Sequence, residues 1–116
     1  MTVKKARITE TLLIKDQDTL AFSITPLLAA AVYTTGTISV KNYDKIVGTC
    51  FADQVGTLHA EFSSDGTNWD GIESYTYTAS LQLALNIDTS SLYMRLRFVN
   101  GGVNQGAFRI YMIGKR

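Results

Sequence analysis

The chain has 116 residues, which is enough for one domain that buries a core without a metal ion or a disulfide. Its 11 basic and 10 acidic residues give a net charge of +1, which argues against a nucleic-acid partner because such proteins carry a strong basic excess. No apolar run is long enough to span a bilayer, and the start of the chain lacks the apolar core of a secretion signal. We therefore expect a soluble protein that is made in a reducing cytoplasm and binds no membrane.

The first fifteen residues differ from the rest of the chain. Several charged side chains crowd this segment, and its apolar positions, Ile8 and Leu12 among them, follow no steady period. Residues 1–15 are expected to form either a first strand with a frayed, charged start or an extended arm that adds a strand to a neighbouring subunit. Residues 16–116 are expected to form a single β-sandwich domain.

Apolar residues at every second position predict strands along most of the remaining chain. In one of them Leu58, Ala60 and Phe62 alternate with polar residues, so that one face is buried and the other is wet. The other predicted strands run through Leu20–Ile24, Ile38–Val40, Tyr43–Ala52, Tyr75–Tyr77, Leu81–Ile87, Leu92–Phe98 and Phe108–Met112. About eight strands without a sustained helical period predict an all-β fold, an antiparallel β-sandwich or a barrel.

Three connections carry a local signal. Asp65-Gly66 predicts a tight turn, because glycine tolerates a positive φ and aspartate can bind the backbone ahead of it. The glycine-rich stretch 100–106 predicts a hairpin loop between the last two strands. Leu27–Val32, which follows Pro26, is expected to form at most one short turn of helix.

Few side chains are available for catalysis. Cys50 and His59 are the single cysteine and the single histidine, so the chain can form neither an internal disulfide nor a metal site with two such ligands. Cys50 lies in an apolar strand and is expected to be a small buried hydrophobic residue, while His59 is expected on the wet face of its strand. We predict a protein that is not an enzyme and has no cofactor.

The turn that contains Asp65, Asn68 and Asp70 presents oxygen ligands of the kind that calcium prefers. The spacing of the three residues lacks the alternating pattern of an EF-hand loop, and acidic turns are common in β-proteins. A plain turn is therefore favoured over a calcium site.

Trp69 has two possible roles. Exposed together with Tyr75 and Tyr77, it would form a platform on which a sugar ring could stack, or an anchor for an interface. Folded back instead, it would close one end of the sandwich core. The second role is favoured.

Three arginines, Arg95, Arg97 and Arg109, lie opposite the apolar faces of the last two predicted strands. If these strands are hairpin neighbours, the three guanidinium groups form one basic patch. The patch would pair with acidic side chains of the same sheet, for which the candidates are Glu61, Glu73 and Asp88, or dock an acidic surface of a partner.

Two of these motifs carry a resemblance. Ser63–Asp70 reads SSDGTNWD, and the strand from Tyr93 reads YMRLRFVNGG. Over residues 43–113 the chain resembles small β-sandwich proteins of tailed-phage virions, in which an "SxDGxNW" turn precedes a "YxRxRxxNG" strand. The resemblance implies a jelly roll or a close relative of it.

Members of that group look like capsid decoration (cement) proteins, which are commonly trimeric and sit over the joints between major capsid subunits. The resemblance thus implies a homotrimer on the capsid surface of a virion, bound to the major capsid protein lattice. Its interface would use the N-terminal arm, an exposed apolar segment and arginines. The residues expected there are Ile8, Leu12, Leu27, Leu28, Val32, Tyr33, Arg95, Arg97 and Arg109. The alternative is a carbohydrate- or receptor-binding module of a phage tail, with Trp69, Tyr75 and Tyr77 against a surface glycan.

Overall fold

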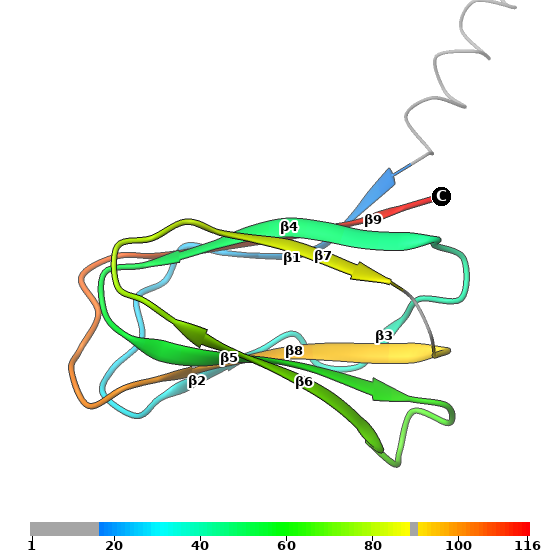
Figure 1. Cartoon of the computed structure of the whole chain (residues 1–116), viewed down its shortest axis with the longest axis horizontal. Helices are drawn as coiled ribbons and strands as arrows, with labels where there is room; N and C mark the ends of the chain where they lie inside the picture. Colours follow the sequence, from blue (N-terminus) through cyan, green and yellow to red (C-terminus); the bar gives the residue numbers. More distant parts are fainter. Residues whose placement is uncertain (1–16, 89–90) are drawn as a thin grey trace, which may run out of the picture.

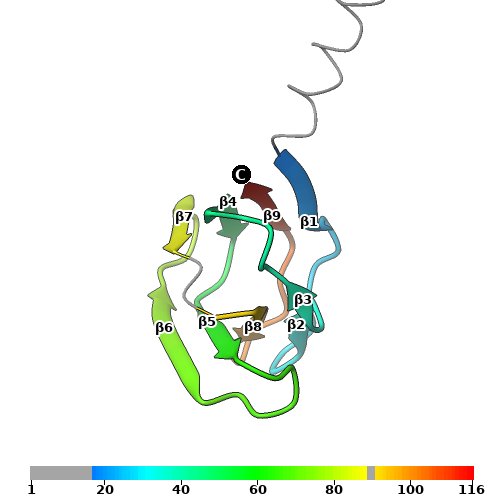
Figure 2. The same ribbon diagram turned by 90° about the vertical axis from the view of Figure 1, so that its right-hand side faces the viewer.

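A computed structural model describes residues 17–88 and 91–116, and these form two antiparallel sheets packed face to face (Figures 1 and 2). The predicted all-β sandwich is confirmed. The strands of the described residues are β1 (Gln17–Ser23), β2 (Val32–Thr34), β3 (Ile38–Ser39), β4 (Lys45–Ala52), β5 (Gly56–Ser63), β6 (Gly71–Tyr77), β7 (Leu83–Asp88), β8 (Tyr93–Asn100) and β9 (Phe108–Lys115). In the described part of the chain, no helix is long and apolar enough to cross a membrane.

The strand order is that of a jelly roll. One sheet, called sheet A, has the order β1-β9-β4-β7, and the other, sheet B, has the order β2-β8-β5-β6 with β3 also paired to β8. Because β2 and β3 pair with different parts of β8, they occupy one position as an interrupted strand. With that pair counted as one strand, the described residues fill the eight positions of a jelly roll, four in each sheet.

Side chains that alternate inward from both sheets make the core. In β8 every second residue is buried, and β9 shows the same pattern, as expected for strands with one face against the other sheet. The largest fully buried side chains are Tyr77, Phe98, Phe108, Ile46, Leu58, Met94, Leu96, Ile110 and Met112. The predicted inward faces of β5, β8 and β9 are therefore confirmed, and Cys50 is buried as expected.

The first strand departs from the expected alternation. The register of β1 against β9 shifts between Thr19 and Ala21, which marks an irregularity of the β-bulge kind. Beyond the shift, Ala21 is buried, whereas Phe22 and Ile24 are about two-thirds exposed. The expectation that Leu20, Phe22 and Ile24 share one face was wrong, because an extra residue in a strand reverses the side chains that follow it.

Two predicted connections also differ. The stretch 100–106 is not a hairpin loop, because β8 lies in sheet B and β9 in sheet A, so the loop crosses from one sheet to the other (Figure 2). Residues 28–31 form a turn closed by a hydrogen bond from the Ala31 N–H to the Leu28 carbonyl, and β2 begins directly after it. No helical turn forms at Leu27–Val32.

Tyr77, at the end of β6, ties sheet B to sheet A. Its ring is 1% exposed, and its hydroxyl accepts a hydrogen bond from the Ala52 N–H at 2.8 Å. The same hydroxyl lies 2.9 Å from the Ala52 carbonyl oxygen and 2.5 Å from that of Leu81, so it can donate to either. One buried hydroxyl thus satisfies backbone groups at the end of β4 and in the loop before β7.

Tyr77→Phe should lower the free energy of unfolding by about 1–3 kcal/mol, because it leaves buried backbone groups of Ala52 without a partner while keeping the ring. Urea denaturation followed by tryptophan fluorescence measures the loss. Tyr75→Phe is the matched control, since the Tyr75 hydroxyl bonds to the exposed Glu73 carboxylate and should contribute far less. Equal losses in the two variants would contradict the role given to Tyr77.

Candidate functional site

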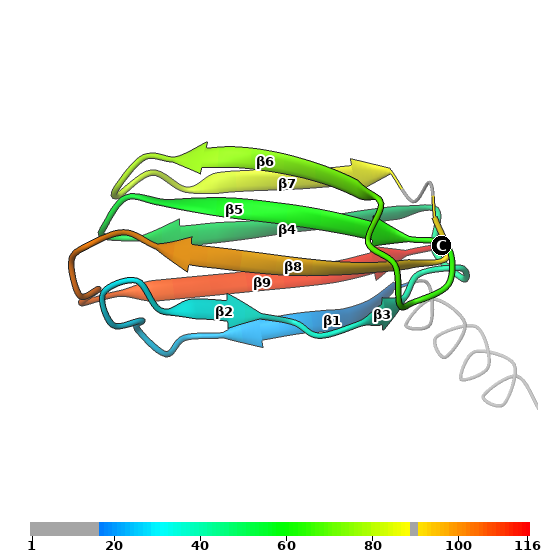
Figure 3. The same ribbon diagram turned by 90° about the horizontal axis from the view of Figure 1, so that it is seen from below.

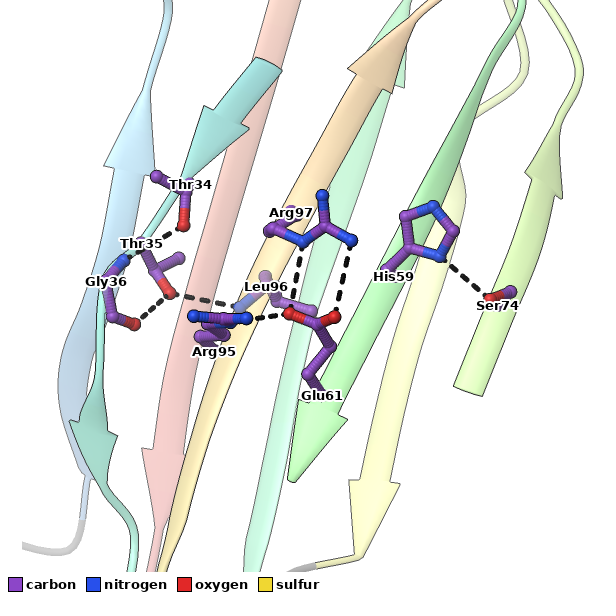
Figure 4. A network of polar contacts seen from close by, with 9 residues as sticks. All are labelled: Thr34, Thr35, Gly36, His59, Glu61, Ser74, Arg95, Leu96 and Arg97. Atoms are coloured by element: carbon purple, nitrogen blue, oxygen red, sulfur yellow. Dashed lines mark hydrogen bonds and ion pairs between the residues drawn. The ribbon is translucent and has the colours of Figure 1, made fainter. Parts of the chain in front are cut away.

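The outer face of sheet B carries a compact ionic cluster of Glu61, Arg95 and Arg97, here called the Glu61 cluster (Figure 4). Glu61 on β5 lies directly opposite Arg95 on β8, and two residues further along each strand Arg97 faces His59. Arg95 Nε donates to Glu61 Oε1 at 2.5 Å. Arg97 donates two hydrogen bonds to the same carboxylate, from Nε to Oε1 at 3.1 Å and from Nη2 to Oε2 at 3.3 Å.

Both arginines are about one-third exposed, while Glu61 is 7% exposed. Burial raises the pKa of the Glu61 carboxyl, but the hydrogen bonds and positive charges of Arg97 and Arg95 outweigh burial and hold the pKa below its ordinary value. Glu61 is therefore ionised at neutral pH. The cluster has one carboxylate for two guanidinium groups, so it keeps one positive charge on this face.

The expectation that the arginines pair with Glu61, Glu73 or Asp88 is confirmed for Glu61, but the three-arginine patch was wrong. Arg109 lies on β9 in sheet A, away from Arg95 and Arg97 in sheet B, and stacks on Phe51 with its guanidinium carbon 4.4 Å from the ring centre. The error follows from the expectation that the last two strands form a hairpin. Strands of a hairpin share a sheet, whereas β8 and β9 lie in different sheets.

Trp69 takes neither expected place. It is half-buried on the outer face of sheet B, where the Arg95 guanidinium lies 4.3 Å from its ring centre. Tyr77 is in the core, and Tyr75 also packs inward against it. The platform of Trp69, Tyr75 and Tyr77 therefore does not form, because β6 turns both tyrosines toward the core.

The Asp65 turn is organised around its own backbone. Gly66 has a φ of +80°, as expected for a tight turn. Asp65 Oδ1 accepts hydrogen bonds from the N–H groups of Thr67 and Asn68, each at 2.8 Å, and Oδ2 accepts one from Asn68 Nδ2 at 2.7 Å. These backbone donors, with the Asn68 and Ser63 side chains, lower the pKa of Asp65.

The Asp65 oxygens proposed as calcium ligands are thus already engaged within the turn. Among the residues that the structure describes, no group of three or more His, Cys, Asp and Glu side chains is placed to hold a metal ion. Asp65 acts here as a cap for the turn, as aspartate commonly does.

Cys50 and His59 lie in different sheets and face different ways. Cys50 points into the core from β4, where burial raises the pKa of its thiol to about 12, so the thiol stays protonated. His59 lies on the outer face of sheet B, with Nδ1 2.8 Å from the Ser74 hydroxyl (Figure 4). The geometry does not bring the two together as a nucleophile and a base.

The expected interface segment Leu27–Tyr33 is divided between core and solvent. Leu28 and Val32 are exposed at 69% and 46%, whereas Leu27 and Tyr33 pack against the core. The ring of Tyr33 is tilted against that of Phe108, with 5.8 Å between the ring centres. Ile8 and Leu12, like all of residues 1–15, lie outside the described residues.

Two buried amides that the sequence analysis did not single out hold this segment in place. Asn100 Nδ2 donates to the carbonyl oxygens of Leu28 at 2.9 Å and Val103 at 2.8 Å, and lies 3.3 Å from that of Leu27. Gln105 Oε1 accepts from the Leu27 N–H at 2.8 Å. The sequence did offer a signal for Asn100. It continues the row of inward-facing residues of β8, and a buried amide at such a position needs backbone hydrogen-bond partners.

A family model described as the N-terminal domain of the uncharacterised protein YqxG matches residues 8–115, and the chain belongs to this family. No curated protein matches the sequence.

Two solved structures share the fold. The PBSX exported protein XepA matches 86% of this chain at 26% sequence identity and a TM-score of 0.74. This chain spans only 37% of the XepA chain. The second structure is that of Bacillus endospore appendages, described as a family of disulfide-linked pili. The match covers 85% of this chain and 86% of the pilus chain, at 13% sequence identity and a TM-score of 0.55. At this identity the match shows a shared fold alone.

Glu61→Gln should destabilise the protein at neutral pH by about 1–3 kcal/mol, because two half-buried guanidinium groups lose their counter-charge. The low pKa of Glu61 in the folded state means that its ionic contribution is present above the pKa of the unfolded chain, near 4.3, and is lost as pH falls below it. The wild type should therefore lose more stability than Glu61→Gln between pH 6 and pH 3.

Urea denaturation of both proteins across this pH range measures the difference. Glu73→Gln is the matched control, because the exposed Glu73 binds only the Tyr75 hydroxyl among the interactions described. Parallel pH profiles for the wild type and Glu61→Gln would contradict an ionic role for the cluster.

Proposed function

We propose that the chain is a non-enzymatic structural module of a phage-related particle, and in particular a capsid decoration protein that bridges major capsid subunits as a homotrimer. It would work by burying surface across the joints of the lattice, which raises the cost of separating the subunits. The proposal places the protein on the capsid surface, with no cofactor and no nucleic-acid partner.

The similarity to the PBSX exported protein XepA carries this proposal. It extends over most of this chain at 26% identity, and it links the fold to a phage-related, exported protein. Because this chain spans only 37% of XepA, the activity of that whole protein is not transferred. The likeness to the spore pili shows a shared fold alone and adds nothing to this proposal.

The surfaces of the described residues agree with a protein that binds by packing. Ten large apolar side chains are substantially exposed there, while the Glu61 cluster pairs its charges internally and keeps one net positive charge. A contiguous exposed apolar patch is the usual mark of an interaction site, whereas catalysis needs reactive groups gathered in a pocket. The alternative, a glycan-binding module, requires Trp69, Tyr75 and Tyr77 to be exposed together. Tyr77 is only 1% exposed, so this aromatic platform does not form.

Cosedimentation with purified heads of the phage or prophage that encodes the chain tests the proposal. We expect saturable binding to heads lacking the protein, and a rise in the temperature at which these heads come apart. Light scattering of the free protein should give three times the 12.8 kDa subunit mass, unchanged by a chelator. Heads that neither bind the protein nor gain stability from it would contradict the proposed function.

A deletion of residues 1–14 tests the arm. If this segment adds a strand to a neighbouring subunit, the shortened chain should keep its fold but lose trimer formation and head binding, because strand addition supplies main-chain hydrogen bonds across the interface. Circular dichroism checks the fold, and light scattering the mass. Unchanged mass and binding would show that the arm is dispensable.

A further inference from the structure

In the described part of the chain, the two sheets end in four edges. β1 and β7 are the edges of sheet A, and β6 and the interrupted strand β2/β3 are the edges of sheet B. Figure 3 shows β6 and β7 on one side of the sandwich and β1, β2 and β3 on the other. An edge strand exposes backbone N–H and C=O groups that can pair with another strand, and proteins commonly block such edges. An unblocked edge is therefore a candidate site for strand addition.

Three of the four edges are blocked in recognised ways. β2 and β3 have only three and two residues, too few for a continuous ladder. The register of β1 shifts between Thr19 and Ala21. β6 carries Glu73 on the same side of the strand as Tyr75 and Tyr77, which pack toward the core. Short strands, bulges and inward-facing charges all keep sheet edges from pairing.

β7 has none of these features. Its six residues, Leu83–Asp88, pair with β4 in one continuous register. The strand contains no Gly, Pro, Lys or Arg, and its only charged residue, Asp88, is the last one. Inward-facing apolar side chains alternate with the exposed Ala84 and Asn86. The free side of β7 thus offers a regular row of backbone groups about 20 Å long.

The side of the sandwich that holds β6 and β7 is acidic. Residues 70–88, which contain both strands, have three acidic side chains and no basic one. The three are Asp70, Glu73 and Asp88, and all are exposed. Lys45 of β4 lies opposite Asp88, which leaves the net charge of this side negative. A basic strand would therefore be attracted to this edge more than an acidic one.

Residues 1–15 of the chain have the complementary charge. They contain four basic residues and one acidic residue, a net charge of +3. The stretch Ile8–Ile14 is rich in β-branched residues, which favour strands. Sixteen residues precede β1, and if six of them pair with β7, the other ten span up to about 33 Å. The segment is thus long enough to reach a neighbouring subunit.

We propose that residues 1–15 of one copy add a strand to the β7 edge of a neighbouring copy. The inference rests on the proposed function, because it names the edge that would receive the arm in the homotrimer. Main-chain hydrogen bonds would supply affinity, and the opposite charges would favour this edge over the others. The arm leaves from β1, at the opposite edge of sheet A from β7, so the contact is head-to-tail. Head-to-tail contacts can close into a ring, as a homotrimer requires.

Disulfide trapping between full chains tests the inference. Two variants are co-expressed, one with Asn86→Cys on β7 and the other, carrying a mass tag, with a cysteine in the arm. Thr9→Cys, Thr11→Cys and Leu13→Cys are used one at a time, to sample the register. We expect a mixed covalent dimer under mild oxidation for at least one arm position, because paired strands bring Cα atoms within the roughly 4.4–6.8 Å that a disulfide needs.

The control replaces Asn86→Cys with Thr76→Cys. Thr76 is also exposed in the middle of an edge strand, but on β6 in sheet B, and it should give little mixed dimer. The natural Cys50 is buried and its thiol stays protonated, so it does not compete.

Sedimentation velocity over a range of concentrations gives a second readout. Asn86→Lys should weaken self-association by roughly tenfold or more, because a lysine on an edge strand blocks pairing and repels the basic arm. Thr76→Lys makes the same change of charge on β6 and should leave association nearly unchanged. Circular dichroism confirms that each variant is folded.

The outcomes separate this inference from the proposed function. Trapping at β7 but not at β6, with association weakened by Asn86→Lys alone, supports the inference. A trimer that persists in Asn86→Lys, equal trapping at both edges, or no trapping at β7 overturns the inference and leaves the homotrimer in place. A wild-type chain that stays monomeric at every concentration overturns both the inference and the homotrimer.

Discussion

Four aromatic rings run across the core from one edge of the sandwich to the other, in the order Tyr33, Phe108, Phe98 and Tyr77. Their centres are 5.8, 5.2 and 5.7 Å apart, in the tilted and edge-on arrangements that aromatic pairs prefer. Phe108 comes from sheet A and the other three from sheet B. Three of the four rings lie at the ends of β6 and β8 and at the start of β9, so the loops that join these strands begin from a densely packed base.

Paired charges and exposed apolar side chains lie on different parts of the molecule. On the outer face of sheet B, the Glu61 carboxylate accepts two hydrogen bonds from Arg97 and one from Arg95, which stabilises the pairing of β5 with β8. Around Asn100, the side-chain amide donates to the backbone carbonyl oxygens of Leu28 and Val103, whose apolar side chains are exposed. Polar groups thus bond to each other within the subunit, and several large apolar side chains are left exposed.

The candidate site could be predicted only in part. Leu28 and Val32 were correctly expected on the surface, but Leu27 and Tyr33 turn inward, because the chain enters β2 within this segment and alternation follows. Asn100 was missed as a structural residue, since its role depends on carbonyl groups more than seventy residues away. The arginine pair was found because Arg95 and Arg97 share one strand and one face.

The sequence by itself determined the class of fold and the buried faces of β5, β8 and β9, because a period of two needs no knowledge of the neighbouring strand. It also determined the Asp65-Gly66 turn, whose chemistry is local. Tertiary structure alone decided which strands share a sheet. It therefore also decided where the side chains of Arg109, Trp69 and Tyr77 lie. The reason is physical: apart from the β5–β6 hairpin, the paired strands of both sheets are distant in sequence, so hydrogen-bond partners across a sheet leave no mark in local periodicity.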